Sequence, residues 1–267
     1  MDKFAFDQKR IAEGYAKDRP YLHPLVVDKM RKDLEITGMF SHGLDVGCGA
    51  GLSTRALKQI CKAVTGTDIS EEMIAMCHVL YPEDGFEFFC SGAETVTAPE
   101  STFDIVSAAG MINWIDEEAF LTNLQRIMCD NGLLFIYDFW ITDRMAGNDW
   151  ITDRKARNER YTDWYQNCYL KEFPKPPRKE YRWSQEMMPE FVTIEKQTDI
   201  ELAYEFDLDA FIRFMMIQSN VNVQIENGAR MEEEVRQWFY DTLTPIWGEE
   251  TQTLMFEGYN WYLRVRK

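Results

Sequence analysis

The chain has 267 residues, of which 45% are hydrophobic and 28% are charged. This length and balance predict one large α/β domain, or a domain carrying insertions, with a sizeable core. Forty-five acidic residues against 29 basic ones give a formal net charge of −16, which argues against duplex DNA or bulk RNA as a partner. No apolar run approaches the roughly 18 residues of a membrane span, and the first residues lack a signal-peptide pattern, so we expect a cytoplasmic protein.

Helix-like and strand-like segments alternate through the first half of the chain. In chain order the pattern predicts a helix at 25–34, a strand at 43–46, a helix at 52–60, a strand at 63–68, a helix at 70–80, strands at 86–90 and 103–109, a helix at 120–128 and a strand at 133–139. Repeated alternation of this kind predicts right-handed crossovers and a doubly wound, mostly parallel sheet.

The alternation stops after residue 139. Residues 191–206 then read as extended, 208–217 and 231–247 as helices, and 255–265 as a closing strand. We therefore expect a single domain, residues 1–267, with one core sheet and two insertions. The core covers about 25–139, 191–206 and 253–267, and the cap insertions cover about 140–190 and 207–252.

Cysteines and histidines are spread along the chain without the spacing of a disulfide framework or a metal site. No C-x-x-C pair is present, so we expect buried free thiols at Cys48, Cys61, Cys77, Cys90, Cys129 and Cys168. No i, i+4 pair links the histidines, so no metal is expected at His23, His42 and His78.

A glycine-rich loop follows the first predicted strand, in the run Leu44-Asp-Val-Gly-Cys-Gly-Ala-Gly. Glycines between a strand and a helix let a ligand approach the backbone, and the helix N-terminus adds exposed N–H groups. The spacing is G-x-G-x-G and lacks the third glycine of the dinucleotide pattern G-x-G-x-x-G. Asp45 would repel a pyrophosphate but attract an ammonium or sulfonium group, which favours an aminoacyl nucleoside.

This run resembles the first motif of the class I S-adenosylmethionine-dependent methyltransferases. Asp68, at the end of Val64-Thr-Gly-Thr-Asp, resembles the acid with which that family binds both ribose hydroxyls. The segment Tyr15-Ala-Lys-Asp-Arg-Pro-Tyr resembles the trans-aconitate-methyltransferase-like branch, of the methyltransferase-domain 11/25 type. The resemblance covers residues 10 to 140 and implies a Rossmann-like methyltransferase fold, a doubly wound seven-stranded sheet whose helical and aromatic insertions form a lid.

The resemblance implies S-adenosylmethionine as the cofactor. Residues 1–24 would close over it, Asp68 would accept the ribose hydroxyls, and Ile69 and Met73 would border the adenine. The complete cofactor-binding set is Tyr15, Arg19, Asp45, Gly47, Cys48, Gly49, Gly51, Asp68, Ile69, Met73, Ala93, Glu94 and Ala109. The expected substrate pocket contains Tyr21, Asn113 and Trp114.

No strong catalytic base stands out. Many relatives have His-Trp after the fourth strand, where this chain has Asn113-Trp114. The weak catalytic candidates are His23, Asn113 and Tyr137, and His23 also fits an ordinary surface histidine. Asp45 and Asp68 also fit ordinary strand-end acids, and Cys48 fits a small residue packed in the loop rather than a reactive thiol.

One basic stretch interrupts the acidic chain, and aromatic residues are interleaved with it. Its basic members are Arg154, Lys155, Arg157, Arg160, Lys171, Lys175, Arg178, Lys179 and Arg182. Its rings, Tyr161, Trp164, Tyr165 and Tyr169, suit either a nucleic-acid surface or the core side of an amphipathic helix, and we favour the helix. A substrate lid is the preferred functional interpretation.

These features predict methyl transfer from S-adenosylmethionine to a small-molecule acceptor at oxygen, nitrogen or sulfur, by a monomer or homodimer. A carboxylate or thiol acceptor needs no strong base, whereas a phenol must lose a proton. Two alternatives stay open: methylation of a macromolecule, either a protein side chain or structured RNA, and a module that binds the cofactor without turnover.

Overall fold

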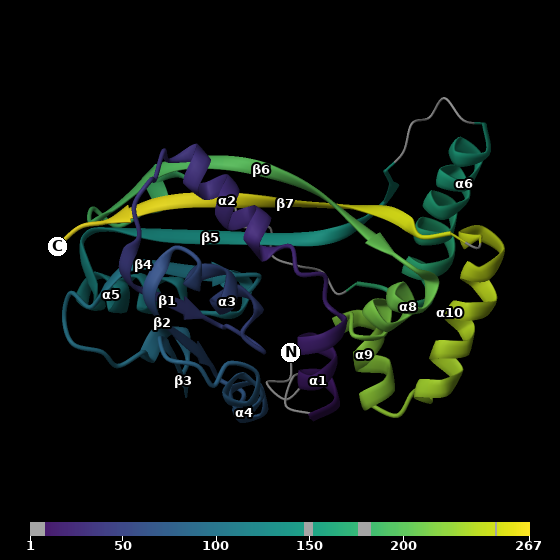
Figure 1. The fold of residues 1–267 in the computed structure, drawn as a ribbon, viewed down its shortest axis with the longest axis horizontal. Helices are drawn as coiled ribbons and strands as arrows, with labels where there is room; N and C mark the ends of the chain where they lie inside the picture. The colour runs from purple at the N-terminus through teal and green to yellow at the C-terminus, as the bar shows by residue number, and fades with distance from the viewer. Residues whose placement is uncertain (1–8, 147–151, 176–182, 249) are drawn as a thin grey trace.

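A seven-stranded sheet, in the order β3-β2-β1-β4-β5-β7-β6, runs through the centre of the molecule (Figure 1). The computed structural model describes residues 9–146, 152–175, 183–248 and 250–267. The strands are β1 Phe40–Val46, β2 Cys61–Asp68, β3 Phe86–Cys90, β4 Phe103–Ala109, β5 Met128–Met145, β6 Val192–Phe206 and β7 Gln252–Val265. Strands β1 to β5 pair in parallel and β7 is antiparallel to both neighbours, which confirms the predicted mostly parallel sheet.

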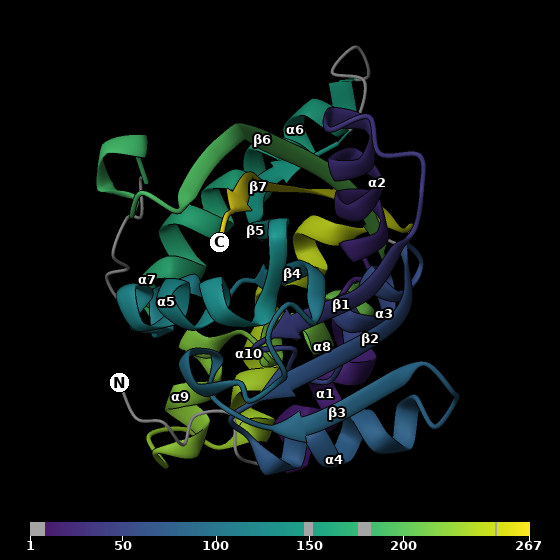
Figure 2. The same cartoon turned by 90° about the vertical axis from the view of Figure 1, so that its left-hand side faces the viewer.

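Helices cover both faces of the parallel part of the sheet (Figure 2). Helices α2 (His23–Asp33) and α3 (Leu52–Lys58) pack on one face, and α5 (Glu117–Ile127) packs on the other. Helix α4 (Glu71–Leu80) begins at the predicted cap, where the Ser70 hydroxyl accepts a hydrogen bond from the Met73 amide at 3.3 Å. Helix α1 (Lys9–Asp18) was not predicted from the sequence.

Strands β5, β6 and β7 extend far beyond the parallel sheet and carry a second, helical layer (Figure 1). Between β5 and β6 lie α6 (Thr152–Asp163), a π-helical segment (Trp164–Tyr169) and the short α7 (Leu170–Glu172). Between β6 and β7 lie α8 (Leu208–Met216), α9 (Ser219–Glu226) and α10 (Glu232–Trp247). Their apolar side chains form a separate, largely aromatic core against the far ends of the strands.

Several element bounds differ from the sequence prediction, most of all those of the fifth strand, and one short helix was missed. The fifth strand, predicted at 133–139, runs from Met128 to Met145, because its far half pairs with β7 beyond the parallel sheet. Helix α9 was missed because its eight residues show little amphipathic contrast. At Gly258, a Cβ atom would lie 1.9 Å from the Asp138 carbonyl oxygen, so β5 and β7 approach each other more closely there than a side chain permits.

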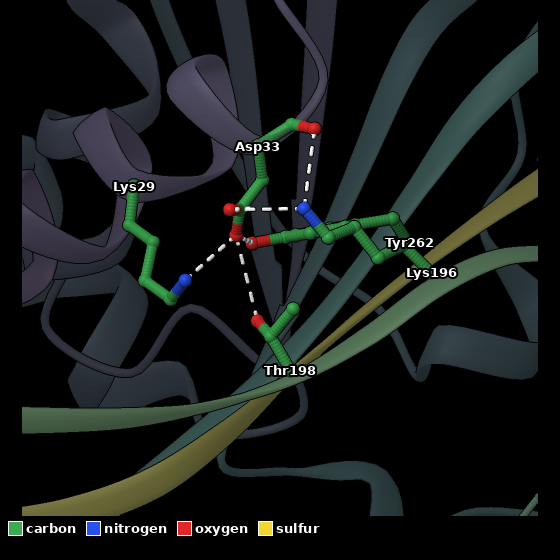
Figure 3. A network of polar contacts seen from close by, with 5 residues as sticks. All are labelled: Lys29, Asp33, Lys196, Thr198 and Tyr262. Atoms are coloured by element: carbon green, nitrogen blue, oxygen red, sulfur yellow. Dashed lines mark hydrogen bonds and ion pairs between the residues drawn. The ribbon is translucent and has the colours of Figure 1, made fainter.

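Helix α2 is fixed to the sheet by a polar network around Asp33 (Figure 3). The carboxylate accepts hydrogen bonds from Lys29 and Tyr262 at 2.8 Å, from Lys196 at 3.1 Å and from Thr198 at 3.5 Å. Burial opposes ionisation of Asp33, but the bonds from Lys29, Tyr262 and Lys196 outweigh it and lower its pKa to about 2. The network joins the end of α2 to β6 and β7, and so positions the residues at the start of α2.

The cysteines are free, as expected, but only Cys48, Cys61 and Cys77 are buried. The expectation of burial is wrong for Cys90 and Cys168, which are exposed, and Cys129 is half-buried. None of the helices in the described ranges combines the length and the apolar character that a membrane crossing requires.

Candidate active site

The three loop glycines share a left-handed backbone but differ in what surrounds them. Their φ angles are +63° at Gly47, +53° at Gly49 and +85° at Gly51. An added Cβ would lie 2.9 Å from Met111 at Gly47 and 2.6 Å from Tyr81 at Gly51, whereas at Gly49 it would meet no atom within 4 Å. Gly47 and Gly51 are therefore required by protein packing, while Gly49 faces open space in which a ligand can approach the backbone.

Asp68 lies at the tip of β2 beside this open glycine. Its carboxylate accepts hydrogen bonds from the Gly49 amide at 2.8 Å and from the Ser70 amide at 3.0 Å. The next side chain, Ile69, is 60% exposed. A carboxylate, an open backbone and an exposed apolar side chain together suit a ribose with its attached base, so these residues fit the expected cofactor.

Asp45 lies beneath the loop and is completely buried. It accepts hydrogen bonds from the hydroxyls of Ser53 at 2.6 Å, Thr54 at 2.7 Å and Ser107 at 2.5 Å. Burial raises the pKa of Asp45 to about 6 against the opposing effect of these donors. Asp45 thus joins the start of α3 and strand β4 to the loop, a role that the sequence did not predict, and its contact with a cationic ligand stays a prediction.

The residues expected to border the adenine lie near the loop in different surroundings. Met73 is buried and packs with Ala50 of the loop. Ala93 belongs to the core on the α5 face, and the Glu94 carboxylate accepts a hydrogen bond from the Asp116 amide at 2.9 Å. Ala109 is half-buried at the end of β4. Their contacts with the cofactor stay predictions.

Helix α1 contacts both the glycine loop and the helical layer. Tyr15 packs against Ala50 and Met73 on one side and against the aromatic core of the helical layer on the other. The Arg19 guanidinium lies 4.7 Å from the centre of the Tyr15 ring. Asp18 forms an ion pair with Arg213 of α8 at 3.0 Å. The first helix therefore bridges the expected cofactor site and the insertions.

The surface interpretation of His23 is wrong, because its side chain is only 8% exposed. Its Nδ1 atom lies 2.9 Å from the Tyr137 hydroxyl, so two of the proposed proton acceptors form one hydrogen-bonded pair. Burial and the nearby Arg19 charge lower the pKa of His23 to about 3, and burial raises the pKa of Tyr137 well above its usual value. At neutral pH this pair is uncharged and is a poor acceptor for a substrate proton.

Two polar atoms of the expected substrate pocket are buried without a hydrogen-bond partner within the described part of the chain. They are the hydroxyl oxygen of Tyr21 and Oδ1 of Asn113. Trp114 is 50% exposed beside Asn113, and Met111 packs directly on Gly47. The segment after β4 therefore lies against the glycine loop and presents polar and aromatic groups that a bound molecule can satisfy.

The aromatic residues of the basic stretch lie inside the helical layer. Tyr161, Trp164, Tyr165 and Tyr169 are all buried, which confirms the interpretation as the core side of amphipathic helices. These rings are therefore not exposed for stacking on nucleic-acid bases. Arg178, Lys179 and Arg182 lie outside the described residues. Over the described ranges, no group of three or more acidic, histidine or cysteine side chains is arranged to hold a metal ion.

Comparison with known proteins gives matches to methyltransferases. Residues 44–136 match the family model described as methyltransferase domain. The ubiquinone biosynthesis O-methyltransferase of Coxiella burnetii is 28% identical over 125 residues, which are 46% of this chain and 53% of that protein. The protein of the same name from Parvibaculum lavamentivorans is 32% identical over 96 residues, which are 35% of this chain and 38% of that protein. The chain thus spans about half the length, or less, of these relatives.

The overall fold also has a solved counterpart. A structure from Anaeromyxobacter dehalogenans, described as a type II methyltransferase, superposes with a TM-score of 0.62 and 18% identity. The superposition covers 85% of this chain and 89% of that one. It supports the fold over far more of the chain than the matched domain covers.

Proposed function

Because residues 44–136 form a methyltransferase domain of the S-adenosylmethionine-dependent class I, we propose that the chain transfers a methyl group from this cofactor to an oxygen atom of a small molecule. The relatives named as O-methyltransferases support the choice of oxygen. The acidic chain and the burial of the aromatic rings in the basic stretch support a small acceptor over RNA.

The observation that carries this proposal is the open backbone of Gly49, held 2.8 Å from the Asp68 carboxylate. Of the three loop glycines, only Gly49 faces open space, and a side chain at position 49 would fill that space. The Asp68 carboxylate would accept hydrogen bonds from the two hydroxyls of a ribose. These two features suit a nucleoside cofactor whose ribose lies across the tip of β2.

The bound cofactor supplies a methyl carbon that is electrophilic because it is attached to a positively charged sulfur. The chain has to hold the acceptor oxygen in line with that carbon and to exclude water. In this proposal Asp68 and the glycine loop bind the nucleoside, and Tyr15 and Arg19 cover it. The His23–Tyr137 pair stays neutral and orients groups rather than removing a proton, so in this proposal the acceptor oxygen binds already ionised, as a carboxylate does.

The acceptor would bind against the segment that follows β4. Asn113 Oδ1 and the Tyr21 hydroxyl gain hydrogen bonds from it, and Trp114 packs on its apolar surface. Each buried polar atom that gains a partner avoids an unfavourable desolvation cost of about 1–3 kcal/mol. We expect Trp114→Ala to raise the KM for the acceptor while the dissociation constant of S-adenosylhomocysteine stays the same.

Binding and transfer test the proposal in sequence. Calorimetry with S-adenosylmethionine should show a single binding site, and NAD and FAD should not bind. Transfer of a labelled methyl group is then followed into metabolite, protein and RNA fractions. Label in the small-molecule fraction supports the proposal, label in protein or RNA supports a macromolecular acceptor, and binding without transfer supports a non-catalytic module.

A cytoplasmic location and a monomeric or homodimeric state belong to the same proposal. Light scattering of the purified chain measures the oligomeric state directly.

A further inference from the structure

Two buried thiols meet at the cofactor loop. Cys48 belongs to the loop itself, and Cys77 lies on α4, which begins after Asp68. The Cys77 thiol donates a hydrogen bond to the Gly49 carbonyl oxygen at 3.2 Å, and the Cys48 thiol donates to the same oxygen at 3.5 Å. Because both thiols contact the same oxygen atom, the two sulfur atoms are close neighbours.

The oxygen that both thiols contact belongs to the residue that carries the proposed function. The Gly49 amide donates to Asp68 and its carbonyl accepts from Cys77 and Cys48, so both polar groups of this residue are held by the protein. Tyr81 and Ile74 pack around the two thiols in one small apolar cluster. Any covalent change at the pair is therefore transmitted directly to the conformation of the loop.

We propose that Cys48 and Cys77 form a reversible disulfide site that disables the cofactor loop under oxidising conditions. The reaction joins the two sulfur atoms and breaks both S–H bonds. Two electrons and two protons pass to an added thiol oxidant, such as the azo compound diamide, which becomes a hydrazine. Both hydrogen bonds to the Gly49 carbonyl are lost, and the loop is tethered to α4. This proposal rests on the proposed function only for its effect on cofactor binding.

The reactivity of the pair should depend on whether the loop is occupied. The interaction with the neighbouring Cys77 thiol, burial and the nearby carboxylates raise the pKa of Cys48 well above the usual value, so this residue stays in its thiol form. Both thiols are also buried, so an oxidant reaches them only when the loop opens. A ligand that holds the loop closed slows the reaction in proportion to the unoccupied fraction, about 100-fold at a ligand concentration 100 times the dissociation constant.

The test uses the full chain with Cys90, Cys129 and Cys168 replaced by serine, which removes the thiols that are exposed or half-buried. After treatment with diamide, peptide mass spectrometry should find Cys48 linked to Cys77. The affinity for S-adenosylhomocysteine, measured by calorimetry, should fall about tenfold or more, as expected from the loss of a hydrogen-bonded loop, and dithiothreitol should restore it. S-adenosylhomocysteine added before diamide should protect the pair.

Cys77→Ser in the same background is the matched control, because its hydroxyl keeps a donor near the Gly49 carbonyl. The ratio of affinities before and after diamide should be close to one in this variant. A Cys48–Cys77 pair that stays reduced in the ligand-free chain, or a disulfide that leaves the affinity unchanged, overturns the proposal. A chain that forms the disulfide but never binds S-adenosylhomocysteine instead refutes the proposed function and removes the regulatory role.

Discussion

Replacement of Asp68 by alanine provides the sharpest test of the site. The carboxylate accepts the Gly49 and Ser70 amides and is expected to accept the ribose hydroxyls of the cofactor. Loss of a hydrogen bond to a charged group costs about 1.5–3 kcal/mol. The dissociation constant of S-adenosylhomocysteine should therefore rise about 10- to 150-fold in calorimetry, at a temperature where the variant is folded.

Asp104→Ala is the matched control for this substitution. Asp104 also accepts two backbone amides, from Ser41 at 2.8 Å and His42 at 2.9 Å, but it does so at the opposite end of the sheet. Both variants should lose similar stability, about 1–3 kcal/mol, in urea unfolding. Only Asp68→Ala should lose cofactor affinity. Equal affinities in the two variants would refute the assignment of Asp68 to the ribose.

Three further predictions concern stability and pH. Asp33→Ala should lower the free energy of unfolding at pH 7 by about 1–2 kcal/mol, a figure reduced because Lys29 and Lys196 are 34% and 42% exposed. Since the Asp33 pKa is lowered from 3.8 to about 2, this difference should persist above pH 3.8 and shrink below it; an equal difference in urea unfolding at pH 7 and pH 3 contradicts the network. Because burial raises the pKa of Asp45 from 3.8 to about 6, the wild type should lose at most about 3 kcal/mol of its free energy of unfolding as pH rises through this range. Asp45→Asn should remove this loss. Burial lowers the pKa of His23 to about 3, so the wild type should also lose stability as pH falls from 6.5 toward 3, and His23→Gln should remove this second trend. Unfolding curves between pH 4.5 and 8 measure both trends. A variant whose stability keeps the wild-type dependence on pH argues against the pKa assigned to that residue.

The parallel part of the fold could be predicted from sequence because its signals are local. The apolar run before Gly47 and the capping residue Ser70 specify a strand and a helix start within a few residues. The far half of β5 could not be predicted in this way. Its pairing with β7 joins residues more than a hundred positions apart, and the alternation of its side chains is mixed with charge.

In the candidate site, too, local signals could be predicted from sequence and contacts between distant segments could not. The motif placed Asp45 and Asp68 at neighbouring strand ends, but it did not reveal that Asp45 is satisfied by three hydroxyls. Ser53 and Thr54 directly follow the loop and could have been noticed as donors, whereas Ser107 comes from a different strand. The His23–Tyr137 pair spans 114 positions, so only the packing of α2 on the sheet brings it together.

Strands β5 and β7 pass along both cores, with one shift in their pairing between Ile141 and Met145, and this limits how the molecule can admit a ligand. A hinge between two domains needs a flexible connection, but here the connection is a hydrogen-bonded ribbon that closes tightly at Gly258. Rotation of the whole helical layer would break that ribbon. We therefore expect a ligand to enter by displacement of α1, which contacts α8 through the Asp18–Arg213 ion pair and the loop through Tyr15.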